Sequence, residues 1–213
     1  NTDNLDLRSR TVTFVSDNNA WKLGDIINST PRIVAGVPLN KYDSVYFDTT
    51  YATFINDNSY KNRGIVFTGG NDGMLHAFRL GKLELSWSGQ STTQKARITN
   101  PFSGTVLGDE AWAFIPKNSL PYLKYLKDPD YCHLYYVDLS PYIFDASIGS
   151  GTGDQSTQTR TQTSWRTVII GGMRYGAACA NTCTAGQDCV NTPATDKGFS
   201  SYFAMDVTNP ASP

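Results

Sequence analysis

Short apolar or alternating segments recur along the chain, and clusters of turn residues separate them. Arg10–Val15 alternates in polarity as a half-buried strand does, and Pro31–Ala35 is a second short apolar run. Gly64–Thr68 and Met74–Leu80 flank the turn cluster Gly-Gly-Asn-Asp-Gly at 69–73. Because two apolar runs around such a cluster are typical of a tight reversal, this pair predicts a β-hairpin.

Six later segments continue the strand pattern. In the first of them Leu83, Leu85 and Trp87 fall on one face, since side chains alternate along a strand. The six segments are Leu83–Trp87, Glu110–Ile115, Tyr131–Asp138, Tyr142–Asp145, Ser164–Ile170 and Ser201–Val207. Many short strands, joined by turns that draw on 18 Gly and 10 Pro, are typical of an all-β protein.

Two segments have helical features instead. Residues 48–58 place three apolar side chains at helical spacing behind a residue that can cap a helix: Tyr51, Phe54 and Ile55, after Thr49 or Thr50. Residues 119–126 begin with a capping Ser119, have Pro121 in the first turn and stop before Asp128-Pro129. We expect one or two short surface helices at these places.

Two parts of the chain look alike. In the first part, residues 67–70 are followed by residues 76–79. In the second part, residues 170–172 are followed, after an insertion, by residues 203–206. Each part reads as a strand, a glycine pair, a turn and a strand with Ala between large apolar residues. An internal repeat of short antiparallel strands is the sequence signature of a β-propeller. We therefore predict that residues 1–213 form a single partial β-propeller domain.

The chain is too short for a closed propeller. Blades take about 40 to 50 residues, and a ring needs at least about four of them. Once its insertions are counted, this chain supplies roughly two to three blades. Because an open arc exposes strand edges and one end of its core, we predict a longer natural protein, or another chain, that completes the ring.

Two long inserted loops are predicted between the strands. Ser147–Thr163 is rich in Gly, Ser, Thr and Gln and cannot bury a core, so we expect a flexible surface loop. Ala177–Thr195 carries three of the four cysteines. Variable loops on a rigid scaffold are where recognition usually resides, so we place partner contacts on these two loops.

The four cysteines permit more than one chemistry. Their spacing suits a disulfide loop or a metal knot. A zinc site prefers close cysteine pairs with a second pair or histidines nearby, and neither histidine of this sequence adjoins the cluster. We therefore favour disulfides, which imply an oxidising compartment, while unpaired thiols stay open. The candidates are Cys132, Cys179, Cys183 and Cys189.

Charge and hydropathy argue against two classes of partner. Lys plus Arg number 18 and Asp plus Glu 19, so a net charge of −1 gives no field that would attract nucleic acid or an anionic bilayer. No apolar run approaches the roughly 20 residues of a membrane span, and residues 1–4 lack Met and a signal pattern. We expect a soluble, processed or excised chain with no nucleic-acid partner and no membrane span.

Six motifs, in order, carry a family resemblance. They are Leu23–Pro31, Gly69–Phe78, Glu110–Pro116, Tyr136–Pro141, Trp165–Gly172 and Tyr202–Pro210. In this order and register they resemble the C-terminal β-propeller of the PilC/PilY family of type IV pilus tip adhesin and biogenesis proteins. The match covers about the first half of that domain.

The resemblance implies a binding module and not an enzyme. It implies export, a place at the cell surface, pilus tip or outer membrane, and roles in pilus assembly, retraction control and adhesion. Pilus subunits such as minor pilins, and host or surface receptors, would be its partners.

The family also has calcium loops of the form Asp-x-Asp-x-Asp-Asn-x-x-Asp in its propeller, whose carboxylates suit a hard cation. No such run occurs in this sequence. We therefore expect calcium only in the part of the propeller outside this segment, and no cofactor in the segment itself.

Two polar groups at the hairpin invite a chemical interpretation. Asn71, Asp72 and Gly73 could offer oxygens to a ligand, but we expect them to shape a turn in which the glycine takes a positive φ. His76 could act as a base, but no nucleophile motif accompanies it, so we expect a structural histidine. No catalytic, cofactor-binding or metal-binding residue is assigned.

Other polar motifs carry weaker signals. Asp109 and Glu110 are adjacent, and adjacent strand residues face opposite sides, so they cannot act as a carboxylate pair. We expect these two, like Asp138 and Asp145 at strand ends, to serve edge solubility and turn capping. Gly149–Gly153 resembles a phosphate loop, but no helix follows it to bind an anion.

Aromatic residues divide between an expected core and an expected surface. The four tryptophans fall about one blade apart and are large enough to fill the space between blades, so we place them in the core. They are Trp21, Trp87, Trp112 and Trp165. The chain has 12 tyrosines, and those that are exposed would suit an adhesive surface.

Two other functions stay open. Similar propellers hold pyrroloquinoline quinone in alcohol and sugar dehydrogenases, with a calcium ion and an Asp base on the axis. The strand ends of this sequence show no convergent set of Asp, Glu and Asn, so we favour the binding module. The second alternative is a structural subunit that completes the propeller of another chain, which the short length favours.

Overall fold

Antiparallel sheets make up most of the secondary structure, and the helices are few and short. The computed structural model describes residues 23–127, 133–149, 159–174, 176 and 200–213. The predicted all-β class is confirmed. The predicted strand at Arg10–Val15 and Trp21 lie outside the described residues.

The first sheet is a meander of four strands in the order β1-β2-β3-β6. The predicted hairpin is present as β2 and β3, with Phe67 opposite Ala77 and with Gly73 at a φ of 97° in the turn. Five of the six residues of β2 are buried and Val66 is half-buried, which fits its place inside the sheet. The strands are β1 (Arg32–Ala35), β2 (Gly64–Gly69), β3 (Leu75–Arg79) and β6 (Glu110–Phe114).

The second sheet is a meander of three strands in the order β7-β8-β9. Side chains of β8 alternate between buried and half-buried along its N-terminal part, which is the pattern of a strand with one face on a core. The strands are β7 (Tyr142–Ser147), β8 (Trp165–Gly172) and β9 (Tyr202–Asp206). All three coincide with sequence-predicted strands to within two residues.

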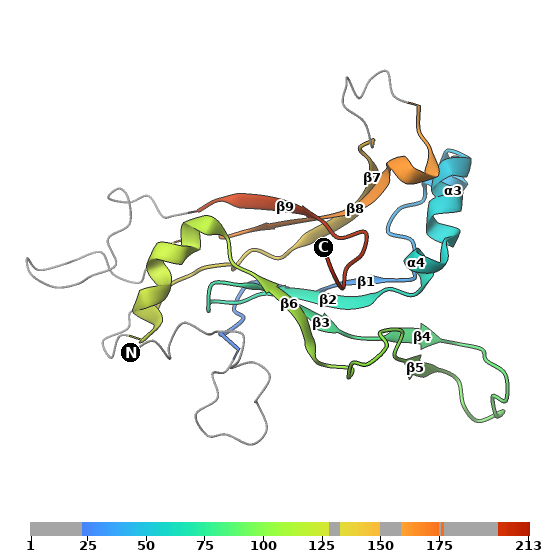
Figure 1. The fold of residues 1–213 in the computed structure, drawn as a ribbon, viewed down its shortest axis with the longest axis horizontal. Coiled ribbons are helices and arrows are strands. Elements are labelled where there is room, and N and C mark those ends of the chain that lie inside the picture. Colours follow the sequence, from blue (N-terminus) through green and yellow to red (C-terminus); the bar gives the residue numbers. More distant parts are fainter. Residues whose placement is uncertain (1–22, 128–132, 150–158, 175, 177–199) are drawn as a thin grey trace, which may run out of the picture.

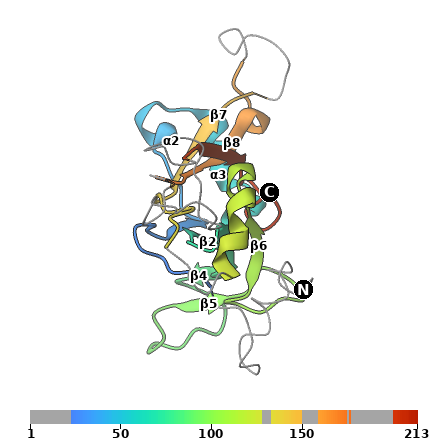
Figure 2. The same ribbon diagram turned by 90° about the vertical axis from the view of Figure 1, so that its left-hand side faces the viewer.

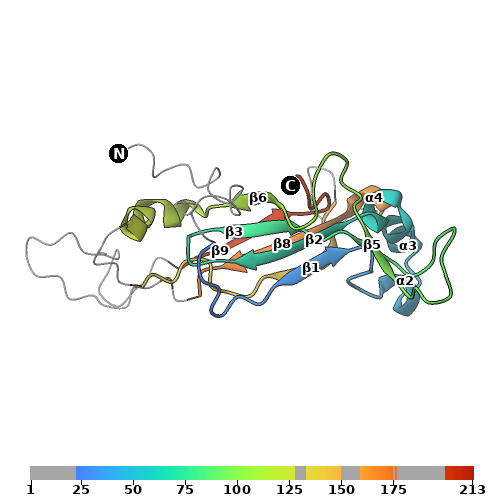
Figure 3. The same ribbon diagram turned by 90° about the horizontal axis from the view of Figure 1, so that it is seen from below.

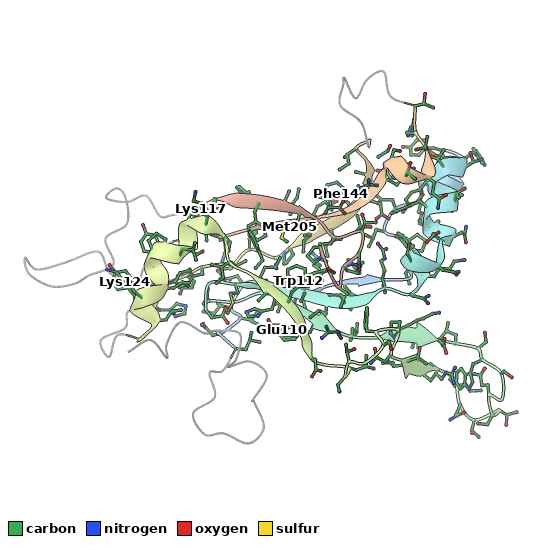
Figure 4. All side chains as sticks on the ribbon, in the orientation of Figure 1. Glu110, Trp112, Lys117, Lys124, Phe144 and Met205 are labelled. Atoms are coloured by element: carbon green, nitrogen blue, oxygen red, sulfur yellow. The ribbon has the colours of Figure 1, made fainter. Side chains whose placement is uncertain are left out.

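The two sheets pack face to face and enclose the main core (Figure 1, Figure 3). Trp112 of the first sheet and Met205 of the second, both labelled in Figure 4, contribute to it. Its fully buried members are Val34, Ile65, Phe67, Leu75, Ala77, Val137, Ile169 and Val207. Side chains from both sheets are therefore removed from water together, which is the main favourable term in folding.

A two-stranded ribbon, β4 (Lys82–Glu84) with β5 (Arg97–Thr99), is inserted between β3 and β6. It projects from the sheets and, seen from the end, lies at the opposite extreme from β7 and β8 (Figure 2). The sequence predicts a longer strand through Trp87, but the regular pairing ends at Glu84. The reason is that β5 has only three residues to pair with it.

Helices cover the two ends of the sheets. The predicted helix at 48–58 is present as α3, but Asp48 is its cap, because its carboxylate accepts the backbone N–H groups of Thr50 and Tyr51. The second predicted helix is a 3₁₀ helix, η2, that begins two residues early and contains Pro121. The helices are α2 (Tyr42–Val45), α3 (Thr49–Asn56), α4 (Asn58–Lys61), η2 (Lys117–Lys127) and η4 (Gln162–Ser164).

An aromatic cluster joins α3 and α4 to the second sheet. The Trp165 ring centroid lies 4.7 Å from that of Tyr51, and the Trp165 indole N–H donates to Thr50 Oγ1. Phe54 and Tyr60 complete the cluster. Trp165 is thus buried as expected, but against helices and not between sheets.

Two predicted strand or loop boundaries are corrected by the structure. Residues 133–138, from the predicted strand Tyr131–Asp138, contain no more than an isolated bridge at Leu134. Tyr136 and Val137 are still fully buried, because their segment crosses close to Gly69, where a Cβ would collide with the Val137 carbonyl oxygen. Part of the predicted loop Ser147–Thr163 is ordered, since β7 includes Ser147 and η4 begins at Gln162.

The central contact of the core yields a stability prediction. Ile169→Ala removes a fully buried side chain between the sheets and leaves a cavity, so we expect a loss of about 2–5 kcal/mol in the free energy of unfolding. Val45→Ala, at a position that is 57% exposed, is the matched control and should change it by less than about 0.5 kcal/mol. Urea denaturation of both variants measures the difference, and equal losses would contradict the assigned core.

Candidate functional site

The turn between β2 and β3 is held by its own side chains and by a distant segment. Asp72 Oδ1 accepts the Met74 N–H, which closes the turn as predicted. Asp72 Oδ2 also accepts the Gly24 N–H, and Asn71 Oδ1 accepts the Tyr136 N–H. Asn71, Asp72 and Gly73 are all buried. Their oxygens therefore serve the protein's own backbone.

His76 lies between two carboxylates. Its Nε2 is 3.0 Å from Asp72 Oδ2, and its Nδ1 is 2.6 Å from Glu110 Oε1. Glu110 is on β6, the neighbouring strand, so the histidine ties the turn to the sheet. Its side chain is fully buried. No local sequence pattern predicts that Glu110 meets His76, because their pairing depends on the strand order.

The protonated imidazole is the form that this arrangement stabilises. Burial alone would lower the pKa of His76, but the hydrogen bonds and charges of Asp72 and Glu110 outweigh it and raise the pKa to about 9. A cationic ring donates from both nitrogens and has no lone pair for a substrate proton. The geometry supports the structural role predicted for His76 and not a base.

A second buried network surrounds Asp145 on β7. The hydroxyls of Tyr51 and Tyr60 donate to Asp145 Oδ2 at 2.7 and 2.8 Å. The Thr167 hydroxyl donates to Asp145 Oδ1 at 2.6 Å and accepts from Arg63 Nη1 at 2.6 Å. Asp145 and Thr167 are fully inaccessible to solvent. The network joins α3, α4, β7 and β8.

Arg63 supplies the opposite charge from the start of the first sheet. It precedes β2, donates to the Ala35 carbonyl, and its guanidinium carbon lies 3.4 Å from the centre of the Tyr60 ring. Burial lowers the pKa of Arg63, and the nearby Tyr60 and Asp145 oppose that effect. Burial also raises the pKa of Tyr60 to about 12, against the charge of Arg63. Tyr60 and Asp145 therefore both interact with the buried Arg63 cation.

The expectation that Asp138 and Asp145 serve strand edges is wrong. Both are buried, and Asp138 accepts the backbone and side-chain N–H groups of Asn28. A usable signal was present for Asp145: two-residue alternation places it on the same strand face as Ile143, which packs on the core. No sequence pattern pointed to Tyr51, Tyr60 or Arg63 as its partners.

An exposed apolar surface lies on the ribbon. Leu83 pairs with Ile98 on one face, and Leu85 follows directly after β4. These side chains are 61%, 58% and 68% exposed. The other face carries an ion pair of Glu84 with Arg97, whose guanidinium lies over the Trp87 ring. A two-stranded ribbon is marginal alone, so an uncovered apolar face on it is unusual.

Several sequence-predicted features fall outside the described residues. They include all four cysteines, Cys132, Cys179, Cys183 and Cys189, the loop Ala177–Thr195, residues 150–158 of the loop Ser147–Thr163, and most of Gly149–Gly153. Disulfide pairing and loop contacts stay predictions.

Metal and membrane signatures were sought in the described part of the chain. There, no group of three or more His, Cys, Asp or Glu side chains is arranged to hold a metal ion. The carboxylate oxygens of Asp72 and Asp138 already accept backbone N–H groups, which does not fit a role as calcium ligands. None of the helices in the described residues has the length and apolar character of a membrane span.

Comparison with known proteins identifies the relatives. A type IV pilus biogenesis factor PilY1 homolog of Xylella fastidiosa (strain Temecula1) is 28% identical over 201 residues, which is 89% of this chain and 9% of the relative. PilY1 of Pseudomonas aeruginosa (strain PAO1) is 30% identical over 195 residues, 89% of this chain and 11% of the relative. The chain is similar to a segment of PilY1-type pilus biogenesis factors. The family resemblance predicted from the six motifs is therefore confirmed.

The similarity has a defined extent. This PilY1-like segment spans about a tenth of the length of the curated relatives that it matches. No family model matches the chain, and no solved structure matches it significantly. Both relatives are named as type IV pilus biogenesis factors.

The Asp145 network generates a second stability prediction. Asp145→Asn keeps the side-chain shape but leaves Arg63 buried without its counter-charge, so we expect a loss of about 3–5 kcal/mol in the free energy of unfolding. Glu84→Gln breaks the partly exposed pair with Arg97 and should cost less than about 1 kcal/mol. Equal effects of the two variants in urea denaturation would show that the buried network does not bind the sheets together.

His76 generates a pH prediction. Folding raises the pKa of His76 from 6.5 to about 9. The stabilisation that its ion pairs give is therefore complete below pH 6.5 and is lost as the pH rises through 9. The full contribution is roughly 3 kcal/mol. We expect the difference in unfolding free energy between the natural chain and His76→Gln to be constant below pH 6.5 and to shrink toward pH 9. A difference that does not depend on pH, or an NMR titration of His76 near 6.5, would refute the charged form.

Proposed function

We propose that this PilY1-like segment is a binding scaffold that acts in pilus assembly, retraction control and adhesion. It does so through surface contacts and not through catalysis. The observation that carries the proposal is the similarity to PilY1-type pilus biogenesis factors over nearly nine tenths of the chain. Pilus components, among them minor pilins, are the protein partners, and host or surface receptors are the adhesion targets.

The interior supports a scaffold role. His76 and Asp145, two fully buried ionisable groups with several partners, use those partners to connect elements of the fold. A catalytic group has to reach a substrate, whereas these side chains are closed off from solvent. The quinoprotein alternative gains no support from them.

The ribbon supplies a contact surface within the described residues. Its apolar face of Leu83, Leu85 and Ile98 projects away from the core, and apolar area of this kind is what protein interfaces bury. We assign its partner to a protein component of the pilus, since the relatives are named for pilus biogenesis. The loops Ser147–Thr163 and Ala177–Thr195 add further contacts in this proposal, beside the ribbon.

Location and ions follow from the same proposal. The protein is exported to the cell surface, at the pilus tip or the outer membrane, where the four cysteines form disulfides. Calcium binds elsewhere in the propeller domain and not in this segment.

The ribbon allows a direct functional test. The double variant Leu83→Ser with Ile98→Ser, introduced into the full-length pilus biogenesis factor, removes two apolar contacts without touching the core. We expect bacteria that carry it as their only copy to lose surface pili or surface attachment, counted by electron microscopy and by an adhesion assay.

Val45→Ser is the matched control, because Val45 is similarly exposed but lies on helix α2 and not on the ribbon. The exported amount and the unfolding midpoint of both variants should equal those of the natural protein. Normal piliation and normal attachment with the ribbon variant would contradict a contact on the ribbon.

A further inference from the structure

One exposed aromatic residue has a strained backbone. Phe47 has a φ of 54°, in the left-handed region that favours glycine and asparagine. A residue with a Cβ atom loses stability in this conformation, because the Cβ comes too close to the backbone. Among the described residues, Arg174 is the other non-glycine residue with a positive φ. Strain of this kind persists where the side chain has a use.

The local turn requires the conformation but not the phenylalanine. The Tyr42 carbonyl accepts the N–H of Tyr46 at 3.2 Å and that of Asp48 at 3.1 Å, so the chain curls back at Phe47 where α2 ends. Asp48 then caps α3. A glycine would take the same path without strain. The side chain of Phe47 therefore needs its own explanation.

The fold itself does not use the Phe47 ring. An apolar residue just before a helix cap often packs on the fourth residue of the helix, which is Ala52 in α3. Phe47 is 82% exposed, so no such packing buries it. Arg174 differs, because its guanidinium lies 3.8 Å from the buried carboxylate of Asp138. The strain at Phe47 thus keeps an aromatic ring in solvent.

The preceding residue, Tyr46, is also exposed, and it is supported from the core. Tyr46 is 71% exposed, and its ring centroid lies 6.0 Å from that of Tyr42. The Tyr42 ring is in turn 5.4 Å from the buried Trp165 ring. Helix α2 lies with α3 and α4 at one end of the sheets (Figure 3). We call Tyr46 and Phe47 the aromatic tip. Supported aromatic side chains are typical anchors of protein interfaces.

The charges around the aromatic tip are of both signs. Lys41 is exposed and Asp43 is half-buried at the start of α2. On the other side Arg160 pairs with Asp48 at 3.0 Å. A surface that enters an anionic lipid headgroup layer is surrounded by basic residues, whereas a protein interface has an apolar centre and a mixed polar rim. The balanced rim therefore favours a protein partner over a membrane.

We propose that the aromatic tip inserts into an apolar pocket of another protein, and that the rim of this pocket carries charges of both signs. The strain at Phe47 is retained because the ring contributes binding that a glycine could not give. This contact is separate from the one on the ribbon. It does not depend on the role in pilus biogenesis.

The strain gives a first test in purified full-length factor. Phe47→Gly relieves the positive φ and removes almost no buried surface, so we expect its unfolding midpoint to be at least that of the natural protein. Phe47→Ala is the matched control, because it also removes the ring but keeps the Cβ that causes the strain. Its midpoint should lie below that of Phe47→Gly. A lower midpoint of Phe47→Gly than of the natural protein would make the ring structural and overturn the proposal.

Photo-crosslinking in living bacteria identifies the partner. The photoreactive residue p-benzoylphenylalanine replaces Phe47 in the full-length factor, and mass spectrometry identifies what it captures after irradiation. The same residue at Leu120, a 52% exposed position on η2, is the matched control. We expect one protein adduct at a several-fold higher yield than at Leu120, and a several-fold loss of that adduct when Tyr46→Ser is added. The captured protein, once purified, should bind the Phe47→Gly factor at least tenfold more weakly than the natural one.

Four other outcomes would each overturn the proposal. They are an adduct with lipid, an adduct with a second copy of the factor, a yield no higher than at Leu120, and equal affinity of the captured protein for the natural and Phe47→Gly factors. Normal piliation with the ribbon variant would leave this contact untouched. Failure of the capture at Phe47 would likewise leave the pilus role untouched.

Discussion

Packing of one sheet face against the other is the contact on which the rest of the structure depends. Ile65, Phe67 and Ala77 of the first sheet meet Ile143, Ile169 and Met205 of the second. This burial supplies the apolar driving force, and it is non-directional. By itself it would not fix how one sheet is turned on the other.

Polar bridges at the two ends of the sheets supply that direction. At one end Asp145 collects Tyr51, Tyr60 and Thr167, and Thr167 in turn accepts from Arg63 at the start of the first sheet. At the other end Asn28 and Asp138 join the segments that lead into β1 and β7. A buried charge that loses its partner is costly, so any rotation of one sheet on the other that breaks these bridges is disfavoured.

Much of the fold follows from local pattern. The hairpin of β2 and β3, strands β6 to β9 and helix α3 come from apolar periodicity and turn residues, which act over a few positions. The pairing of His76 with Glu110, and of Asp145 with Tyr51 and Tyr60, could not be predicted, because these residues meet through strand order and helix placement over separations of 34, 94 and 85 residues. Residues 133–138 look like a strand because they must be buried, yet their segment crosses the sheet and does not extend it. The predicted partial propeller stays a prediction.

Burial between the sheets holds them together and the polar bridges set their orientation, and an experimental structure of the full-length factor at side-chain resolution tests this most directly. We expect Ile169 and Met205 to pack on Phe67, with Asn28 bonded to Asp138. A structure in which Phe67 packs on the opposite face of the second sheet, against Ile170, would contradict it.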